Sequence, residues 1–527
     1  MPLQPVLIAG SWRPARATGS FGAESPLDGQ PFPEEFPISG WPDCDEALDA
    51  AAVAAALLAD LPRERIAQFL TRFAERIEAA AAELVEAAHR ETALAKAPRL
   101  AEVELPRTVV QLRQAAAATL DGSWAVPTID SKINLRSCLR AIGPILVMGP
   151  NNFPFAYSGV AGGDFAAAIA AGNPVIAKGH PLHPRTVGLL AREAFGAVAD
   201  AGLPPATVQL LYHLEPESGL RLVADRRIGA TAFTGSRSGG LKLKAAADAA
   251  GKLIYLELSS INPVVLLPGA LAERGPKIAE EFAGSCLLGG GQFCTNPGFV
   301  ILFGNANAEA FIRDARGRFE AATPPPLLSS GVARSLAENV AALRAAGAQL
   351  VTGGTPLPPP GFRYANTLLR VTGEAFLREA QKLQTEVFGS AALLVIVKDG
   401  SEGAAVIDSL LGNLTGSVYS DSRGADEALY GQLAPRLRGR VGRLLNDKMP
   451  TGVAVSPAMN HGGPYPSTGH PGFTAVGMPA SLRRFAQLQC FDNVRPDRLP
   501  APLGNPNPNG RMWRLVDGQW SQNDAGT

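Results

Sequence analysis

The amino-acid sequence predicts an α/β fold in which helices cover both faces of a largely parallel β-sheet. Short apolar runs, rich in leucine and β-branched residues, recur along the chain, and turn residues follow each of them. Helical stretches separate these runs, as in "PRTVGLLAREAFGAVADAG" (residues 184–202). Because parallel strands need crossover connections, this alternation favours a sheet that is buried on both faces.

The first part of the chain is expected to be helical. Two Ala-rich stretches between residues 45 and 95 carry apolar residues at helical spacing. The apolar face of the second stretch is made of Ile66, Leu70, Phe73 and Ile77. Glu and Arg occupy its opposite face, so this helix is predicted to lie at the protein surface.

Strand runs follow, and chemically informative residues stand where they end. The runs are contained in residues 139–154, 172–179, 207–214, 228–236 and 253–269. Ligands of doubly wound sheets bind at the carboxyl ends of the strands. The polar and glycine residues found at these ends are Asn152, Lys178, Gly235, Ser236 and Glu257.

At 527 residues, the chain is long enough for two or three domains. A second α/β block begins near Ala270, with helices expected around 272–290 and 335–350 and a strand around 390–399. The tail (residues 500–520) is rich in Pro and Asn but holds two Trp residues. Disordered tails rarely contain them, so we expect the tail to pack on another surface, such as a neighbouring subunit.

Composition argues against several classes of function. Lys and Arg together number 48 and Asp and Glu number 48, so the net charge is zero and electrostatic binding to nucleic acid or to an anionic membrane is not expected. The most apolar stretch, residues 158–177, is interrupted by Asp164 and Asn173, and the N-terminus does not resemble a signal peptide. We therefore expect a soluble, cytoplasmic protein.

The cysteines and histidines indicate neither a disulfide framework nor a metal site. The five cysteines include no CxxC pair, and their odd number fits a reducing compartment. The six histidines show no metal-binding spacing, so no metal is expected.

Cys294, in "GGGQFCTNPG" (residues 289–298), is the first residue with a specific chemical signal. Most free cysteines are small buried hydrophobes. Here Gly289, Gly290 and Gly291 precede it and would let the backbone approach a ligand closely. Loop-forming residues follow it, and such a loop offers free N–H groups. The pattern predicts a reactive cysteine with a lowered pKa.

A cysteine hydrolase is one alternative for this cysteine. It would need a histidine base, and His461 in "AMNHGGPYP" is the suggestive one. Nothing in the sequence connects His461 to Cys294, and this alternative leaves the strand-end turns unexplained.

Six motifs taken together resemble the aldehyde dehydrogenase superfamily, from about residue 8 to near residue 500. In chain order they are "GPNNFPFAYSG", "PVIAKGHPLHP", "AFTGSRSGG", "LELSSINPVV", "GGGQFCTNPG" and "TEVFGSAALLVI". The resemblance implies a Rossmann-like NAD(P)-binding domain (residues 1–122 and 140–268), an α/β catalytic domain (269–470) and an oligomerisation element with the tail (123–139 and 471–527). A homodimer or homotetramer is therefore expected.

The resemblance also assigns catalytic roles. Cys294 would be the nucleophile that adds to the aldehyde carbon. Asn152, with the backbone N–H of Cys294, would hold the oxyanion. Glu257 would activate water to hydrolyse the thioester, and its apolar neighbours suggest a half-buried carboxylate.

Cofactor residues carry over in the same way. Lys178 would reach the adenosine ribose, and His180 of the same motif would also bind the cofactor. Gly235 and Ser236 would open the helix that receives the pyrophosphate. The nicotinamide ribose would be bound by Glu386, with Phe388 beside the ring.

The cofactor itself is expected to be NADP, with NAD left open. A carboxylate near the ribose would repel the 2′-phosphate of NADP. Residues 179–181 contain no carboxylate, and Pro181 occupies the position three after Lys178.

Within the superfamily, "MPTGVAVSPAMNHGGPYPST" (residues 449–468) and other segments resemble the α-ketoglutarate semialdehyde (2,5-dioxopentanoate) dehydrogenases. The resemblance implies a substrate with a distal carboxylate, for which a guanidinium is a matching partner. Arg107 is the candidate anchor, with Arg237 second; a surface or interhelix salt bridge is the alternative for Arg107. The residues predicted to line the substrate tunnel are Phe153, Tyr157, Val160 and Phe293.

Three alternatives remain at this level. The enzyme could have a broader or different aldehyde specificity. It could pass the acyl group to CoA, although Glu257 favours hydrolysis. It could be a non-catalytic paralogue, but the presence of Cys294, Glu257 and Asn152 together argues against this alternative.

Overall fold

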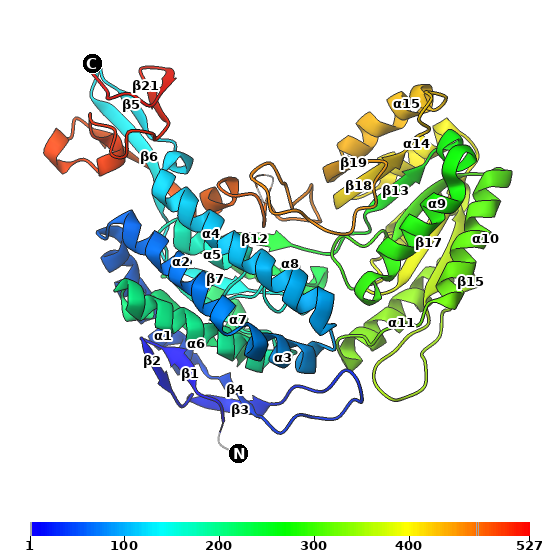
Figure 1. Cartoon of the computed structure of the whole chain (residues 1–527), viewed down its shortest axis with the longest axis horizontal. Helices are drawn as coiled ribbons and strands as arrows, with labels where there is room; N and C mark the ends of the chain where they lie inside the picture. The colour runs from blue at the N-terminus through cyan, green and yellow to red at the C-terminus, as the bar shows by residue number, and fades with distance from the viewer. Residues whose placement is uncertain (1–2, 471, 473, 527) are drawn as a thin grey trace.

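The computed structural model describes residues 3–470, 472 and 474–526, and its first unit is a seven-stranded sheet (Figure 1). Across the sheet, the strands are β12 (Leu253–Glu257), β11 (Ala230–Thr234), β7 (Ile145–Met148), β8 (Val175–Lys178), β9 (Val208–Leu211), β1 (Val6–Ile8) and β2 (Ser11–Arg13). The first five strands are parallel, and β1 and β2 add as an antiparallel edge. The predicted parallel sheet is confirmed.

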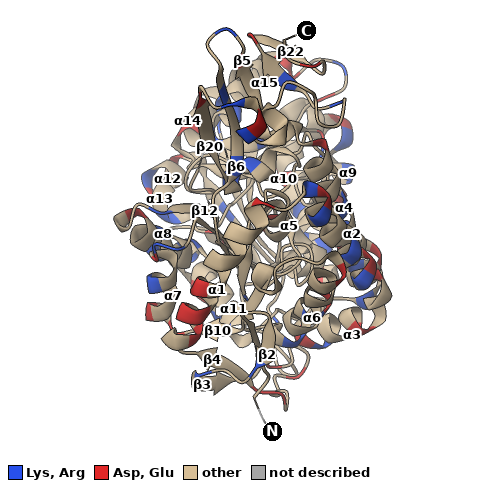
Figure 2. Ribbon diagram, turned by 90° about the vertical axis from the view of Figure 1, so that its left-hand side faces the viewer, with Lys and Arg blue, Asp and Glu red and all other residues tan. Residues whose placement is uncertain are grey.

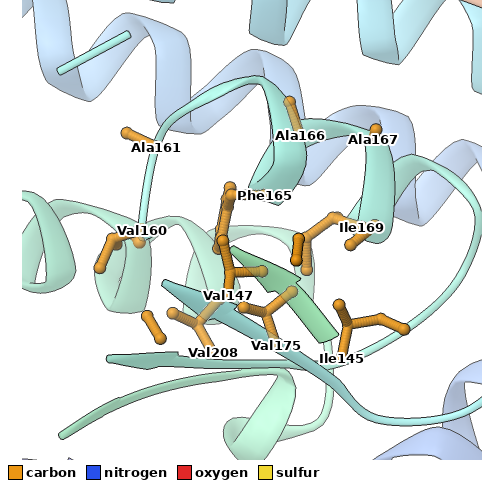
Figure 3. Close-up of a cluster of buried hydrophobic side chains, with 14 of the residues drawn as sticks. Ile145, Val147, Val160, Ala161, Phe165, Ala166, Ala167, Ile169, Val175 and Val208 are labelled. Atoms are coloured by element: carbon orange, nitrogen blue, oxygen red, sulfur yellow. The ribbon is translucent and has the colours of Figure 1, made fainter. Parts of the chain in front are cut away.

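Helices cover this sheet, as the alternating pattern predicts. They are α1 (Trp41–Ala59), α2 (Arg63–Ala79), α3 (Ala81–Thr92), α4 (Leu105–Asp121), α5 (Gly163–Ala170), α6 (Pro184–Ala201), α7 (Pro216–Val223) and α8 (Arg237–Ala249). The predicted apolar face of α2 is buried, including Leu70 and Phe73. Figure 3 shows Phe165 and Ile169 of α5 directed at Val147 of β7 and Val175 of β8.

The second unit is also built on seven strands. In order, they are β15 (Gln349–Thr352), β16 (Thr367–Thr372), β17 (Ala391–Val397), β14 (Phe299–Phe303), β13 (Pro263–Leu266), β18 (Asn413–Tyr419) and β19 (Val441–Asn446). Only β15 pairs antiparallel among these described strands. The helices are α9 (Pro268–Leu287), α10 (Ala306–Ala321), α11 (Ser330–Ala345), α12 (Gly373–Arg378), α13 (Ala380–Leu383), α14 (Gly400–Ser409) and α15 (Glu427–Arg438).

The chain crosses between the two sheets inside one apolar run. Residues 253–269 form two strands, with β12 at the edge of the first sheet and β13 inside the second. The crossing at residues 258–262 lies earlier than the boundary at 268–269 that we predict from sequence. The reason is that β13 already pairs with β14 and β18.

A third sheet joins the segment around residues 128–141 to the tail. Its strands are β20 (Ala486–Asp492), β6 (Leu135–Ala141), β5 (Thr128–Asp130), β21 (Arg514–Val516) and β22 (Gln519–Ser521). Figure 1 shows this sheet projecting at the upper left, away from the two larger units. Trp513 and Trp520 of the tail are exposed, and Leu488 on the edge strand β20 is 69% exposed.

The remaining elements are short. A small sheet contains β10 (His213–Leu214), β4 (Phe36–Ser39) and β3 (Ala17–Phe21). The π-helical segment η1 (Lys96–Glu104) leads into α4. The 3₁₀ segments are η2 (Ser123–Ala125), η3 (Pro205–Thr207), η4 (Leu288–Gly291), η5 (Ala480–Phe485), η6 (Pro496–Arg498) and η7 (Ala501–Leu503).

The surface carries both signs of charge. Figure 2 shows Lys and Arg intermingled with Asp and Glu over the outer helices, including α2 and α4. Within the described residues, no helix combines the length and apolar character that crossing a membrane would require.

The α2 core face can be tested by a matched pair of substitutions. Leu70 of α2 is fully buried, whereas Leu57 of α1 is 53% exposed. Leu70→Ala should lower the free energy of unfolding by about 2–5 kcal/mol, because it removes buried methyl groups and leaves a cavity. Leu57→Ala should change it by less than about 0.5 kcal/mol. Urea unfolding followed by circular dichroism measures both, and equal losses would contradict the assigned core face.

Candidate active site

A cavity opens where the strands of the first sheet end. It has a volume of about 730 Å³ and is lined by residues of both large units. Gly235 and Glu257 line it from the ends of β11 and β12. Cys294 and Glu386 line it from the second unit. The structure thus brings four residues singled out in the sequence to one cavity, which has the size typical of a ligand site.

Three glycines in left-handed conformations precede the turn that carries Cys294. Gly289, Gly290 and Gly291 all have positive φ angles, between 57° and 70°. A Cβ atom on Gly291 would lie 2.1 Å from the carbonyl oxygen of Gly389. At Gly291, the close approach that the glycines predict is made to another backbone segment. This contact fixes the cysteine turn against the segment that follows Phe388.

Asn262, which no predicted motif role includes, holds the same turn from the other side. Its amide nitrogen Nδ2 lies 2.9 Å from the carbonyl oxygens of both Cys294 and Asn296. Its own backbone is left-handed, at φ 49°, and its N–H donates to Asn413 Oδ1 at 3.2 Å. The available signal was an Asn immediately before Pro263 in a short connection between two strand runs.

Two donors are placed for an oxyanion beside the thiol. Asn152 is buried, and its Nδ2 donates one N–H to the carbonyl of Gln292 at 2.8 Å. The second N–H of that amide has no hydrogen-bond partner among the described residues, and neither has the backbone N–H of Cys294. Amide donors left without partners suit an oxygen that gains charge during a reaction.

A buried ion pair positions the Asn152 loop. Arg99 pairs with Glu104, which is fully buried. Arg99 donates to the carbonyl of Asn152 at 3.1 Å, and Glu104 accepts the N–H groups of Phe155 and Ala156 at 2.8 and 3.1 Å. Both charges are therefore used to hold the loop that presents the Asn152 amide.

His461 joins Glu257 and Cys294, although nothing in the sequence connects them. His461 Nε2 lies 3.0 Å from Glu257 Oε1 and 3.4 Å from Cys294 Sγ. Glu257 is 1% exposed, so it is fully buried and not half-buried as predicted. The three donor atoms lie within 4.8 Å of one another, a spacing that a metal ion could also use, though the sequence predicts none. The residue considered only for a hydrolase is thus part of the nucleophile's environment.

This environment raises the pKa of Cys294 well above its ordinary value, chiefly through burial and then through the negative charge of Glu257. Arg107 opposes the shift. The lowered pKa predicted from the glycine-rich turn is therefore wrong. The physical reason is that a neighbouring carboxylate and desolvation both disfavour the thiolate, so the thiol needs a base when it attacks.

Aromatic rings form a wall that leads away from the thiol. Phe153 lies 5.6 Å from Phe293 and 5.0 Å from Tyr157, measured between ring centroids. Tyr157 in turn lies 5.8 Å from the His461 ring. Phe153, Tyr157 and Phe293 are therefore contiguous, and their role as the wall of a substrate tunnel stays a prediction. Val160 is not on this wall, because the turn after Tyr157 directs it into the core beside β7 and β9 (Figure 3).

Arg107 of α4 reaches this wall with its charge uncompensated. Its guanidinium donates to the Tyr157 hydroxyl at 3.1 Å and to the carbonyl of Val453 at 2.6 Å. Its carbon Cζ lies 5.4 Å from the Tyr157 ring centre. No Asp or Glu in the described part of the chain forms an ion pair with it. The salt bridge considered as an alternative is therefore not formed.

Residues 12–464 match the aldehyde dehydrogenase family. The chain belongs to this family. This aldehyde dehydrogenase is 37% identical to alpha-ketoglutaric semialdehyde dehydrogenase 2 of Azospirillum brasilense, over 98% of this chain and 100% of that protein. It is 33% identical to the alpha-ketoglutaric semialdehyde dehydrogenase of Acinetobacter baylyi, over 94% of this chain and 95% of that protein.

Solved structures support the same fold. The 3,6-anhydro-L-galactose dehydrogenase in complex with NAP superimposes with a TM-score of 0.80 at 20% identity, covering 93% of this chain and 99% of that chain. The lactaldehyde dehydrogenase from Escherichia coli gives a TM-score of 0.79 at 21% identity, with the same coverage. At these identities the likeness shows the fold, which confirms the predicted fold class.

The aldehyde dehydrogenase cavity has groups suited to the family's nicotinamide cofactor. Ser236 caps α8 by accepting the N–H of Gly239 at 3.3 Å, which leaves other N–H groups of the first turn facing the cavity end. Gly235 has no room for a side chain, because a Cβ atom there would lie 2.8 Å from the Phe233 ring. Glu386 accepts the N–H of Ser260 at 3.3 Å, and burial raises its pKa.

The other predicted cofactor residues divide between the cavity wall and the layer behind it. Phe388 and His180 line the cavity. Lys178 ends β8 behind His180, and burial lowers its pKa to about 8. Five of the six predicted cofactor residues therefore line the cavity that Cys294 also lines, and Lys178 is separated from the lining residue His180 only by Gly179.

The raised pKa of Cys294 can be measured by alkylation. The test uses a Cys490→Ser background, because Cys490 is exposed while Cys44, Cys138 and Cys286 are buried. The rate of iodoacetamide labelling should keep rising with pH beyond the ordinary cysteine range of about 8.5. Glu257→Gln removes a negative charge that disfavours the thiolate, so the midpoint should move to lower pH. A fast, pH-independent rate at pH 7 in the wild-type site would contradict the assignment.

Proposed function

We propose that this aldehyde dehydrogenase oxidises α-ketoglutarate semialdehyde (2,5-dioxopentanoate) to 2-oxoglutarate, with NADP as the preferred cofactor. The observation that carries the substrate class is Arg107, a cation without a carboxylate partner on the aromatic wall. A partly buried guanidinium that lacks a counter-charge suits a substrate carboxylate. The two relatives at 37% and 33% identity, named for this semialdehyde, support the choice.

The first chemical step uses the cysteine and the histidine. The thiol proton moves to His461 Nε2 at 3.4 Å, and the resulting imidazolium faces Glu257 at 3.0 Å. The sulfur forms a bond to the aldehyde carbon, and the carbonyl electron pair moves to oxygen. The oxyanion accepts the free N–H of Asn152 and the N–H of Cys294.

The second step releases the product. When bound, the nicotinamide cofactor accepts the hydride that converts the adduct to a thioester. Glu257, buried at the end of β12, takes a proton from the attacking water. Collapse of the new adduct breaks the carbon–sulfur bond, and the sulfur regains its proton. In this scheme, His461 is the base for the attack by Cys294, and Glu257 is the base for hydrolysis.

The absence of a carboxylate at residues 179–181 supports NADP over NAD. The branch resemblance favours the same choice. For assembly, we propose that the third sheet mediates a homodimer or homotetramer. Its edge strand β20 presents Leu488 to solvent, and Trp513, just before β21, and Trp520 of β22 are exposed as well. Exposed apolar residues beside an open strand edge are typical of a subunit contact.

Two variants separate the chemical steps. Glu257→Gln should leave acylation in place and slow hydrolysis, which gives a rapid burst of about one equivalent of reduced cofactor per site before slow turnover. His461→Gln should slow the burst itself, because the thiol loses its proton acceptor. Stopped-flow absorbance of the reduced cofactor measures both. Loss of the burst in Glu257→Gln would mean that Glu257 is needed already for attack.

The substrate class is tested through Arg107. Wild-type kcat/KM should favour the semialdehyde over a neutral aldehyde of equal length by about ten- to hundredfold, since a charge-assisted hydrogen bond contributes roughly 1.5–3 kcal/mol. Arg107→Gln should remove most of this preference and leave the neutral aldehyde nearly unchanged. Arg113→Gln on the same helix, which breaks only the surface pair with Glu78, is the control.

No preference in the wild type would reject the proposed substrate class. A preference that survives Arg107→Gln would keep the class and assign the anchor to another residue, with Arg237 on the cavity wall tested next.

A further inference from the structure

Three side chains of metal-binding types meet at the nucleophile, and they come from three distant segments. Glu257 ends β12, Cys294 lies on the turn after η4, and His461 lies on the coil between β19 and η5. Nε2 of His461 lies 3.0 Å from Glu257 Oε1 and 3.4 Å from Cys294 Sγ. One oxygen, one nitrogen and one sulfur atom therefore lie around a common point, all within 4.8 Å of one another.

This spacing is close to that of a tetrahedral zinc site. Zn²⁺ binds nitrogen and oxygen at about 2.0–2.1 Å and sulfur at about 2.3 Å. Tetrahedral geometry then separates nitrogen from oxygen by about 3.3 Å, and sulfur from either of them by about 3.5 Å. The two distances from His461 Nε2 lie within about 0.3 Å of these values. The carboxylate oxygen and the sulfur need to approach by no more than about 1.3 Å.

The backbone fixes the coil that carries His461 beside β12. Directly after Glu257, Leu258 donates its N–H to the carbonyl of Ser467 at 2.8 Å. The N–H of His461 itself donates to Thr474 Oγ1 at 3.0 Å. Ligands that are already held in place need little reorganisation when an ion binds.

Glu257 gives a second, independent indication of a cation. It is 1% exposed, and within the described ranges no hydrogen bond from outside these three residues reaches either of its carboxylate oxygens. His461 is its one ion-pair partner in the described part of the chain, and that imidazole is charged only when protonated. A buried carboxylate needs a counter-charge, which a divalent ion would supply.

We propose that Glu257, Cys294 and His461 bind a divalent ion of the zinc type, and that this ion reversibly inhibits the enzyme. Imidazole and thiolate are ligands that Zn²⁺ prefers, whereas Mg²⁺ and Ca²⁺ prefer sets of oxygen atoms. Glu257 and Cys294 line the cavity, which gives the ion an entry path and room for a water ligand. Coordination takes the sulfur as thiolate, and the thiol proton passes to solvent. The nucleophile and both bases are then occupied, so the ion and the aldehyde exclude each other.

Cobalt is the spectroscopic probe, because Co²⁺ takes the same nitrogen and sulfur ligands and, unlike Zn²⁺, absorbs visible light. The protein carries Cys490→Ser, so that the exposed thiol does not compete. About one equivalent of Co²⁺ per chain should produce a sulfur-to-cobalt charge-transfer band, which Zn²⁺ but not Mg²⁺ should abolish. A cobalt spectrum without a sulfur band would overturn the proposal. No aldehyde or cofactor enters this measurement, so its failure is distinct from failure of the proposed function.

Removing one ligand should weaken Co²⁺ binding by about a hundredfold or more, because only three side chains supply the affinity. His461→Gln and Glu257→Gln each test this expectation. His89→Gln on α3, outside the cavity, is the control and should leave binding unchanged. Equal affinity in His461→Gln and in the control would contradict the assigned ligands.

Protection from alkylation tests the site without changing its ligands. In the Cys490→Ser protein, Zn²⁺ at about ten times its dissociation constant should slow iodoacetamide labelling of Cys294 by about tenfold. EDTA should restore both labelling and turnover, and Mg²⁺ should affect neither. If Zn²⁺ inhibits turnover while Cys294 is labelled at an unchanged rate, the ion acts elsewhere and the proposed site is wrong.

Discussion

The active site depends on Asn262, which ties the nucleophile turn to the crossing between the two large sheets. Its Nδ2 lies 2.9 Å from the carbonyls of Cys294 and Asn296, and its own N–H is anchored by Asn413 of β18. The chain leaves β12 at Glu257 and enters β13 at Pro263. Glu257 lies at the start of this crossing, and Asn262 at its end holds the turn of Cys294. The crossing therefore fixes the position of Glu257 relative to Cys294. A buried amide can do this because both its hydrogens are used.

Near this crossing, three titratable side chains come into contact. Glu257, His461 and Cys294 lie within reach of one another in a buried volume, where a second negative charge is costly. The thiol is consequently held protonated, and its pKa is raised. The cost is offset during reaction by His461, which can accept the proton while facing Glu257. Burial and a neighbouring base are thus combined in one site.

Arg107 stands at the aromatic wall without a carboxylate partner among the described residues. A missing counter-charge alone does not set it apart, because the guanidinium groups of Arg136 and Arg443 are also satisfied by uncharged acceptors. What sets Arg107 apart is its place. It donates to the hydroxyl of Tyr157, whose ring lies 5.8 Å from the ring of His461. The proposed substrate carboxylate follows from this position.

The sequence by itself determined the features that depend on local patterns. Alternating apolar runs and turns predict the parallel sheets, and Asn152, Glu257 and Cys294 stand out because each follows a strand or a glycine run. The apolar face of α2 follows from helical spacing alone. Only the tertiary structure decided what depends on long-range packing. His461 meets Cys294 across 167 positions, Val160 turns into the core, and one apolar run divides between two sheets. The cysteine pKa belongs to the same group, because desolvation and a neighbour's charge arise only when distant segments pack together.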